Sequence, residues 1–129
     1  MDAVGAITRL IEAIEAGDVE GARACYHPDA RIWHNNDGLF QTADENLRVL
    51  TWMVRTFPVV RYVDVRRFGE GDRAVEQHVL EVDLPENGGT VRIPACIAVT
   101  VDSSGAITLL EEYLDAAAFS PLMAAIGRT

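Results

Sequence analysis

The segment Asp29-Ala30-Arg31-Ile32-Trp33-His34-Asn35 alternates in the way that a half-buried β-strand does. Successive side chains of a strand point to opposite faces, so Ala30, Ile32 and His34 share one face and Trp33 lies on the other. The face that carries the imidazole is otherwise apolar. A titratable ring on that side requires a partner or a ligand, so this strand predicts a polar group at the edge of a buried surface.

The same arrangement recurs later in the chain. In the predicted strand 74–84, His78 shares its face with the apolar residues Leu80 and Val82. The last predicted strand ends in Tyr113-Leu114-Asp115. Two inward imidazoles and a carboxylate at a strand end together predict a pocket.

Length and charge limit the classes of function. The chain has 129 residues, which predicts a single domain over 1–129 with one hydrophobic core. A net charge of −9 with 11 scattered basic residues argues against nucleic acid and against an anionic membrane surface. The two cysteines, Cys25 and Cys96, have neither zinc-site nor disulfide-framework spacing. The sequence has no apolar run of membrane-spanning length, and we expect a cytoplasmic protein.

Helical patterns dominate the first half of the chain. Apolar residues recur at helical spacing over 3–16, and a second helix is expected over 18–25, followed by a turn at His27-Pro28-Asp29. The capping-box pattern Thr42-Ala43-Asp44-Glu45 opens a third helix, which Pro58 ends. A short C-terminal helix is expected over 119–126.

The second half reads as β-structure joined by hairpin turns. Four strands are expected, at 59–68, 74–84, 91–101 and 107–115. This order predicts an α+β fold in which helices cover the concave face of a curved antiparallel sheet. A hairpin that turns about Asn87-Gly88 would place Ile97 opposite His78, and Pro94 predicts an edge or a bulge in its strand.

Three motifs together resemble a known superfamily. They are Ala16-Gly17-Asp18 between two helices, Tyr26-His27-Pro28-Asp29-Ala30 before the first strand, and the terminal Glu112-Tyr113-Leu114-Asp115. The chain resembles the nuclear transport factor 2-like superfamily, and is most similar to its branch of ketosteroid isomerases, limonene epoxide hydrolases and SnoaL-like polyketide cyclases. The resemblance implies a single SnoaL-like domain with a cystatin-like cone, a hydrophobic pocket for a small molecule, and a homodimer.

The resemblance also implies roles for individual residues. His34 falls where ketosteroid isomerases have an aspartate base and where the epoxide hydrolases have an asparagine that helps hold water. Asp115 matches the last-strand aspartate that activates water in the epoxide hydrolases. These two residues, with His78, are the predicted catalytic residues.

Both well-understood reactions of the superfamily lack matching residues here. The oxyanion tyrosine and the protonated aspartic acid of the isomerases correspond to Leu10 and Ile97. The arginine and aspartate of the epoxide hydrolases correspond to Gln77 and Val79. This departure leaves isomerisation, aldol-type cyclisation and hydration as open alternatives.

The residues support cofactor-free acid/base chemistry on a hydrophobic ligand. A desolvated His34 would be neutral at pH 7 and could accept a proton, with Asp115 orienting the ring or acting as the base. The expected ligand contacts are Ile32, Leu80, Ile97, Tyr113 and Trp33. No cofactor or metal is expected, because the histidines lack local metal-ligand spacing. The alternatives are a catalytically inactive binding protein of the same fold and an interaction module without a ligand.

Overall fold

A six-stranded sheet forms the frame of this computed structural model, which describes residues 2–126. The strands are β1 (Tyr26–His34), β2 (Phe40–Thr42), β3 (Val59–Glu70), β4 (Arg73–Asp83), β5 (Thr90–Val101) and β6 (Ile107–Leu114). The helices are α1 (Ala3–Glu15), α2 (Val19–Arg23), α3 (Ala43–Thr56) and α4 (Ala116–Ile126). Across the sheet the strands follow the order β2-β1-β6-β5-β4-β3.

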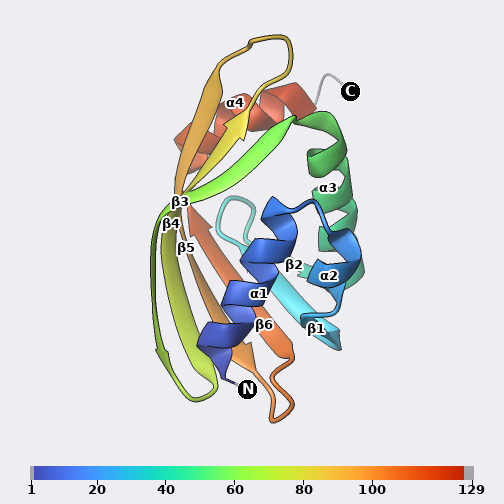
Figure 1. The fold of residues 1–129 in the computed structure, drawn as a ribbon, viewed down its shortest axis with the longest axis vertical. Coiled ribbons are helices and arrows are strands. Elements are labelled where there is room, and N and C mark those ends of the chain that lie inside the picture. Colours follow the sequence, from blue (N-terminus) through green and yellow to red (C-terminus); the bar gives the residue numbers. More distant parts are fainter. Residues whose placement is uncertain (1, 127–129) are drawn as a thin grey trace.

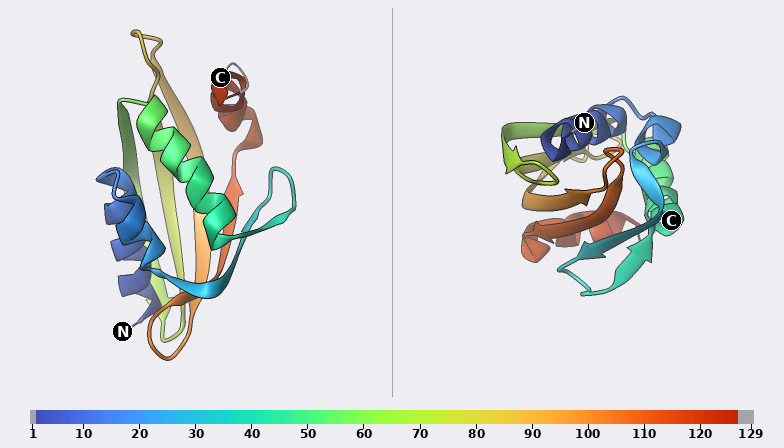
Figure 2. Two further views of the ribbon diagram at one scale, coloured as in Figure 1. Left: turned by 90° about the vertical axis from the view of Figure 1, so that its right-hand side faces the viewer. Right: turned by 90° about the horizontal axis from the view of Figure 1, so that it is seen from below.

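The sheet curves, and its helices gather on the concave side (Figure 1). Viewed from the side, α1 and α3 both lie on one side of the long strands (Figure 2). The predicted α+β class with a curved, helix-covered sheet is therefore confirmed, and it follows from the order of apolar patterns along the chain.

One strand pairing differs from the prediction. Strands β3 to β6 form the expected antiparallel meander, but β1 pairs with β6 in parallel, so the sheet is mixed. A parallel pair requires a long connection, and here α3 and the whole meander supply it. The short strand β2, for which the sequence predicts no strand, pairs antiparallel with β1 over only three residues, too few to leave an alternating pattern.

The register of the middle hairpin also differs by two residues. His78 lies opposite Ala95, and Ile97 lies opposite Glu76. The turn centres on Glu86 and Asn87, which both adopt positive φ angles of 57° and 59°, rather than on Asn87-Gly88. A shift of two residues keeps every side chain on its predicted face, so the inward face of β4 and β5 is as expected.

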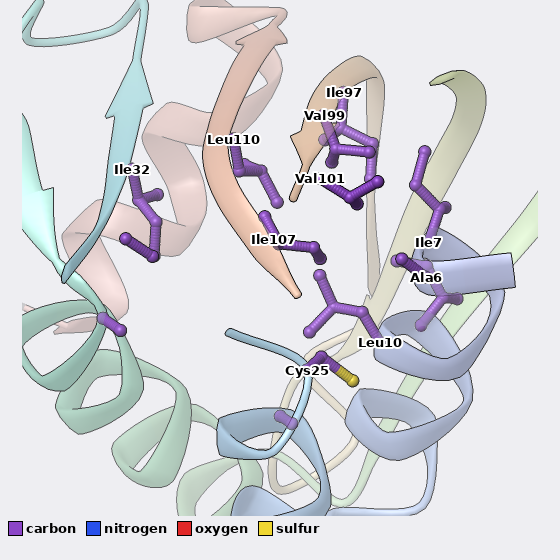
Figure 3. Close-up of a cluster of buried hydrophobic side chains, with 14 of the residues drawn as sticks. Ala6, Ile7, Leu10, Cys25, Ile32, Ile97, Val99, Val101, Ile107 and Leu110 are labelled. Carbon is purple, nitrogen blue, oxygen red and sulfur yellow. The ribbon is translucent and has the colours of Figure 1, made fainter. Parts of the chain in front are cut away.

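Helix α1 closes one part of the concave face. Its buried residues are Ala3, Ala6, Ile7, Leu10 and Ile11, one apolar stripe at helical spacing. In Figure 3 the labelled side chains of α1 point toward those of β5 and β6, where they meet around Val99, Ile107 and Leu110. This cluster fills the end of the concave face nearest the N-terminus.

Three smaller features complete the fold. Helix α2 ends at Arg23, and β1 begins at Tyr26, so the predicted turn at 27–29 lies inside an irregular start of β1. Strand β6 ends opposite Ala95, so Pro94 lies where β5 loses its β6 neighbour, in agreement with the predicted edge, and its carbonyl accepts a hydrogen bond from the Asp115 N–H. Helix α4 begins three residues earlier than expected and covers the other end of the sheet through Leu122.

Helix α3 begins with the predicted capping box. The Thr42 side chain accepts a hydrogen bond from the Glu45 backbone N–H, and the Glu45 carboxylate accepts one from the Thr42 N–H. Each side chain satisfies a backbone donor that the helix itself leaves free. The box fixes where α3 starts, and α3 covers the middle of the concave face.

Thr42→Ala is expected to lower the free energy of unfolding by about 1 kcal/mol, because one N-terminal N–H of α3 loses its acceptor. Urea unfolding followed by circular dichroism measures the change. Ser103→Ala, in the exposed loop between β5 and β6, is the matched control and should leave stability unchanged. Equal stability of the two variants would contradict the role of the capping box.

Candidate functional site

A cavity of about 150 Å³ lies between the concave face of the sheet and helices α1, α3 and α4. Most of its lining is aliphatic or aromatic. The residues of its lining with polar side chains are Tyr26, His34, Asn46, Tyr62, His78 and Glu112. An apolar hollow with a few convergent polar groups is the usual form of a small-molecule site.

The parallel pairing of β1 with β6 places His34 directly beside Glu112. The His34 Nε2 atom lies 3.1 Å from Glu112 Oε1, and the two side chains are only 20% and 19% exposed. Both residues line the cavity. An imidazole and a carboxylate in this contact form a pair that can accept or donate one proton.

The environment of His34 raises its pKa above the ordinary value of 6.5. Burial acts to lower the pKa, but the hydrogen bond and the negative charge of Glu112, together with Asp37, outweigh burial. The expectation of a ring kept neutral by desolvation considered burial alone and did not include this carboxylate partner, which acts in the opposite direction. Near neutral pH the protonated ring is favoured more than in a free histidine.

A second imidazole–carboxylate pair lies on β4. The His78 Nδ1 atom is 2.6 Å from Glu76 Oε2, and Arg67 of β3 donates to Oε1 of the same carboxylate. Glu76 is 0% exposed and His78 is 4% exposed. Burial alone would raise the pKa of Glu76, but the hydrogen bonds from His78 and Arg67 lower it, so the buried group is a carboxylate.

Two tyrosines add hydroxyl groups to the cavity wall. Tyr26 opens β1, and Tyr62 of β3 packs edge-on against His78, with ring centroids 4.7 Å apart. Burial is the main cause that raises the pKa of both phenols; Cys25 and then Glu112 add to it at Tyr26, and Glu112 adds to it at Tyr62. Both hydroxyls therefore keep their protons at physiological pH and are available as hydrogen-bond donors.

The structure places five of the predicted site residues at the cavity. His34 and His78 line it, together with the expected ligand contacts Ile32, Leu80 and Ile97. Leu10, the position matched to the isomerases' tyrosine, lines it as well. Inward alternation on β1, β4 and β5 accounts for the sheet residues.

Asp115, Trp33 and Tyr113 lie outside this cavity, contrary to the prediction. Asp115 caps α4, where its Oδ1 accepts hydrogen bonds from the backbone N–H groups of Ala117 and Ala118 at 3.0 and 3.2 Å. Trp33 and Tyr113 pack against each other on the outer face of the sheet, with ring centroids 5.1 Å apart. Each residue is one position away from an inward neighbour, and one position reverses the face.

The residues matched to the epoxide hydrolases' arginine and aspartate are displaced in the same way. Gln77 and Val79 point to the outer face of β4, and neither lines the cavity. Glu76 and His78 occupy the inward positions at this level of the strand. The two matched positions therefore face away from the cavity.

Sequence reasoning missed Glu112, Glu76, Tyr62 and Tyr26. Alternation contained the signal for the two glutamates: Glu112 stands between the inward residues Leu110 and Leu114, and Glu76 precedes His78 by two positions. Tyr26 gave no such signal, because the start of β1 is irregular.

Two further properties concern metal ions and membranes. Among residues 2–126, no three histidine, cysteine, aspartate or glutamate side chains gather where they could hold one metal ion. None of the helices in this part of the chain has the length and apolarity needed to cross a lipid bilayer.

Comparison with protein families matches residues 7–110 to the model of the SnoaL-like domain. A candidate SnoaL-like polyketide cyclase from Shewanella denitrificans is similar in structure, with a TM-score of 0.78, 13% identity, and coverage of 94% of this chain and 96% of that chain. A candidate polyketide cyclase from Pseudomonas putida gives a TM-score of 0.78, 20% identity, and coverage of 92% and 96%. An NTF2-like protein from Burkholderia xenovorans gives 0.73, 17%, and coverage of 92% and 93%. Comparison with curated proteins gives no match.

The pair of His34 and Glu112 predicts a pH-dependent stability. Because the folded protein raises the pKa of His34, it binds the proton more tightly than the unfolded chain does. This stabilisation is fully present below pH 6.5, the ordinary pKa of the ring, and is lost as the pH rises through the folded-state pKa. Urea unfolding at a series of pH values from about 5.5 to about 9 measures the loss.

Glu112→Gln should remove most of this pH dependence, because the amide carries no charge to hold the proton on His34. His27→Gln changes a histidine outside the cavity and is the control. A wild-type slope retained in the Glu112→Gln variant would show that another group carries the effect.

Proposed function

The chain belongs to the family of SnoaL-like domains, and from this premise we propose that it is an enzyme that performs cofactor-free acid/base chemistry on a hydrophobic small molecule. The observation that carries the proposal is the contact between His34 and Glu112 inside a mostly apolar cavity. A charged group in an apolar cavity is unfavourable unless another charged group pairs with it, and here His34 and Glu112 pair with each other.

The proposed reaction begins with removal of a proton from a carbon beside a carbonyl group. The pair accepts this proton, and the electrons of the broken C–H bond move to the carbonyl oxygen to give an enolate. The same pair then returns the proton, either to another carbon, which isomerises the substrate, or to the oxygen formed when the enolate attacks a second carbonyl, which cyclises it. The pair of His34 and Glu112 thus serves both proton-transfer steps.

The phenols of Tyr26 and Tyr62 support the enolate in this proposal. Both line the cavity and keep their protons, so each can donate a hydrogen bond to the developing negative oxygen. They take the place of the isomerases' oxyanion donors, which are absent where Leu10 and Ile97 stand. Donors held in an apolar cavity stabilise a developing charge more strongly than water does.

The names of the similar structures favour this class of reaction. Those from Shewanella denitrificans and Pseudomonas putida are named as candidate polyketide cyclases. An aldol-type cyclisation passes through an enolate, which agrees with the reaction proposed from the cavity.

A homodimer is part of the same proposal. The outer face of the sheet exposes large apolar side chains, among them Phe68, which is 60% exposed, and Tyr113, which is 49% exposed. Exposed apolar patches of this kind are typical of association surfaces. Sedimentation equilibrium of the purified protein would measure the assembly.

Exchange of carbon-bound hydrogen for deuterium tests the proposed chemistry without knowledge of the natural substrate. Wild-type protein in D₂O should accelerate exchange at the α-carbons of small apolar ketones such as 2-indanone, followed by NMR. His34→Gln and Glu112→Gln should each lower the rate by roughly 10²- to 10⁴-fold, because each removes half of the proton-transferring pair. His27→Gln is the control.

The binding-protein alternative gives a different result in the same experiment. A catalytically inactive protein would bind the ketones, and the two cavity substitutions would change only their affinity. Ketone binding without accelerated exchange by the wild-type protein would overturn the enzymatic proposal.

Tyr62→Phe tests the hydroxyl donors separately. The ring and its packing on His78 are retained, while the enolate oxygen loses one hydrogen bond. We expect a decrease in exchange rate of up to on the order of 10²-fold, with little change in ketone affinity. A loss of affinity with an unchanged rate constant at saturation would assign the hydroxyl to ligand binding instead.

A further inference from the structure

The pair formed by Glu76 and His78 has no part in the proton transfer proposed above. Glu76 has no exposed surface, and both of its oxygens are engaged, one by Arg67 and one by His78 Nδ1 at 2.6 Å. Arg67 and Glu76 are neighbours across β3 and β4, so strand pairing fixes this contact. The carboxylate is thus held firmly and in turn holds the imidazole.

The hydrogen bond to Glu76 determines which nitrogen of His78 carries hydrogen. A carboxylate only accepts hydrogen bonds, so Nδ1 of His78 must donate to it. In the neutral ring, Nε2 then carries the lone pair and is an acceptor. Arg67 already balances the charge of Glu76, so the pair does not require a charged imidazole.

Within residues 2–126, Nε2 of His78 has no hydrogen-bond partner, although it is buried. His78 is a residue of the cavity lining, and its Nδ1 is occupied by Glu76, so Nε2 is its ring nitrogen without a partner. A buried acceptor without a partner is unfavourable, and native proteins contain few of them. A ligand that donates a hydrogen bond to this atom would remove that penalty.

The position of this acceptor relative to His34 and Glu112 follows from the strand register. Glu112 lies beside Ile97 of β5, and Ile97 lies beside Glu76 of β4. The two carboxylates are therefore two strand spacings apart, roughly 10 Å at the level of the backbone. The aliphatic side chain of Ile97 lines the cavity between them.

We infer that His78 Nε2 accepts a hydrogen bond from a hydroxyl group of the ligand. This acceptor is a second polar part of the cavity, across Ile97 from the carbon that His34 and Glu112 deprotonate. The inference rests on the proposed function, which assigns proton transfer to His34 and Glu112. It narrows the substrate class to apolar molecules that carry a phenolic or enolic hydroxyl in addition to the carbonyl group. Glu76 and Arg67 are positioning residues, because they act through His78.

The cavity suggests a simple probe. Apolar cavities of about 150 Å³ bind single aromatic rings, and Tyr62 forms an aromatic wall beside His78. Phenol and toluene have nearly the same size and shape, but only phenol can donate a hydrogen bond. The difference between their affinities therefore measures the contribution of the hydroxyl.

The first experiment uses ¹⁵N NMR of the wild-type protein with labelled histidine. In the free protein, Nδ1 of His78 should carry hydrogen and Nε2 should have the shift of a bare lone pair. Saturation with phenol should move the Nε2 signal toward the hydrogen-bonded range, and saturation with toluene should not. A protonated Nε2 in the free protein, directed at the face of Tyr62, would overturn the inference.

The second experiment compares variants by calorimetric titration. Wild-type protein should prefer phenol over toluene by roughly tenfold, and His78→Phe, which keeps a flat ring, should abolish the preference. Glu76→Gln should weaken the preference and mix the two ring tautomers in the NMR spectrum. Glu81→Gln makes the same chemical change on the outer face of β4 and is the matched control.

A phenol preference that survives in His78→Phe, or phenol that binds no better than toluene, would overturn the inference. These measurements record binding and tautomer without turnover. Failure of the proposed chemistry, seen as absent deuterium exchange, would therefore be recognised separately from failure of hydroxyl recognition.

Discussion

The parallel pairing of β1 with β6 holds the two ends of the fold together. It joins the N-terminal segment to the C-terminal strand of the meander and fixes Ile32 beside Leu110 and His34 beside Glu112. The first pair belongs to the hydrophobic core, and the second is the imidazole–carboxylate pair of the cavity. One strand register therefore sets both the packing of the core and the polar contact in the cavity beside it.

Curvature of the sheet explains why a hollow exists at all. Helix α1 fills one end of the concave face with small and aliphatic side chains, and α4 covers the other end. Helix α3 crosses between them and contributes residues such as Leu50 and Met53 to the cavity wall. The middle of the concave face is thus enclosed without being filled.

The structure tolerates the carboxylates of Glu76 and Glu112 in a mostly apolar region because each has a partner of opposite charge or a hydrogen-bond partner. Glu76 is held by Arg67 and His78, and Glu112 is paired with His34. Leaving one such group unpaired would be strongly unfavourable, which is why the pairs come as units. Among the described residues, the buried side-chain nitrogen or oxygen atom that has no hydrogen-bond partner is Nε2 of His78.

The periodicity of the sequence was enough to predict the fold class, the α1 and α3 helices and the four long strands. It also predicted the inward direction of His34, His78, Ile32, Leu80 and Ile97. These features depend on local rules, namely the period of two in strands, the period of 3.6 in helices, and capping chemistry. That Glu112 rather than Asp115 lies beside His34, and that Glu76 and Arg67 hold His78, depends instead on how the strands pair. Those contacts join residues of different strands. A register shift of two positions, or a parallel rather than antiparallel pairing, exchanges one partner for another while every side chain keeps its face, so the pattern of a single strand does not record the change.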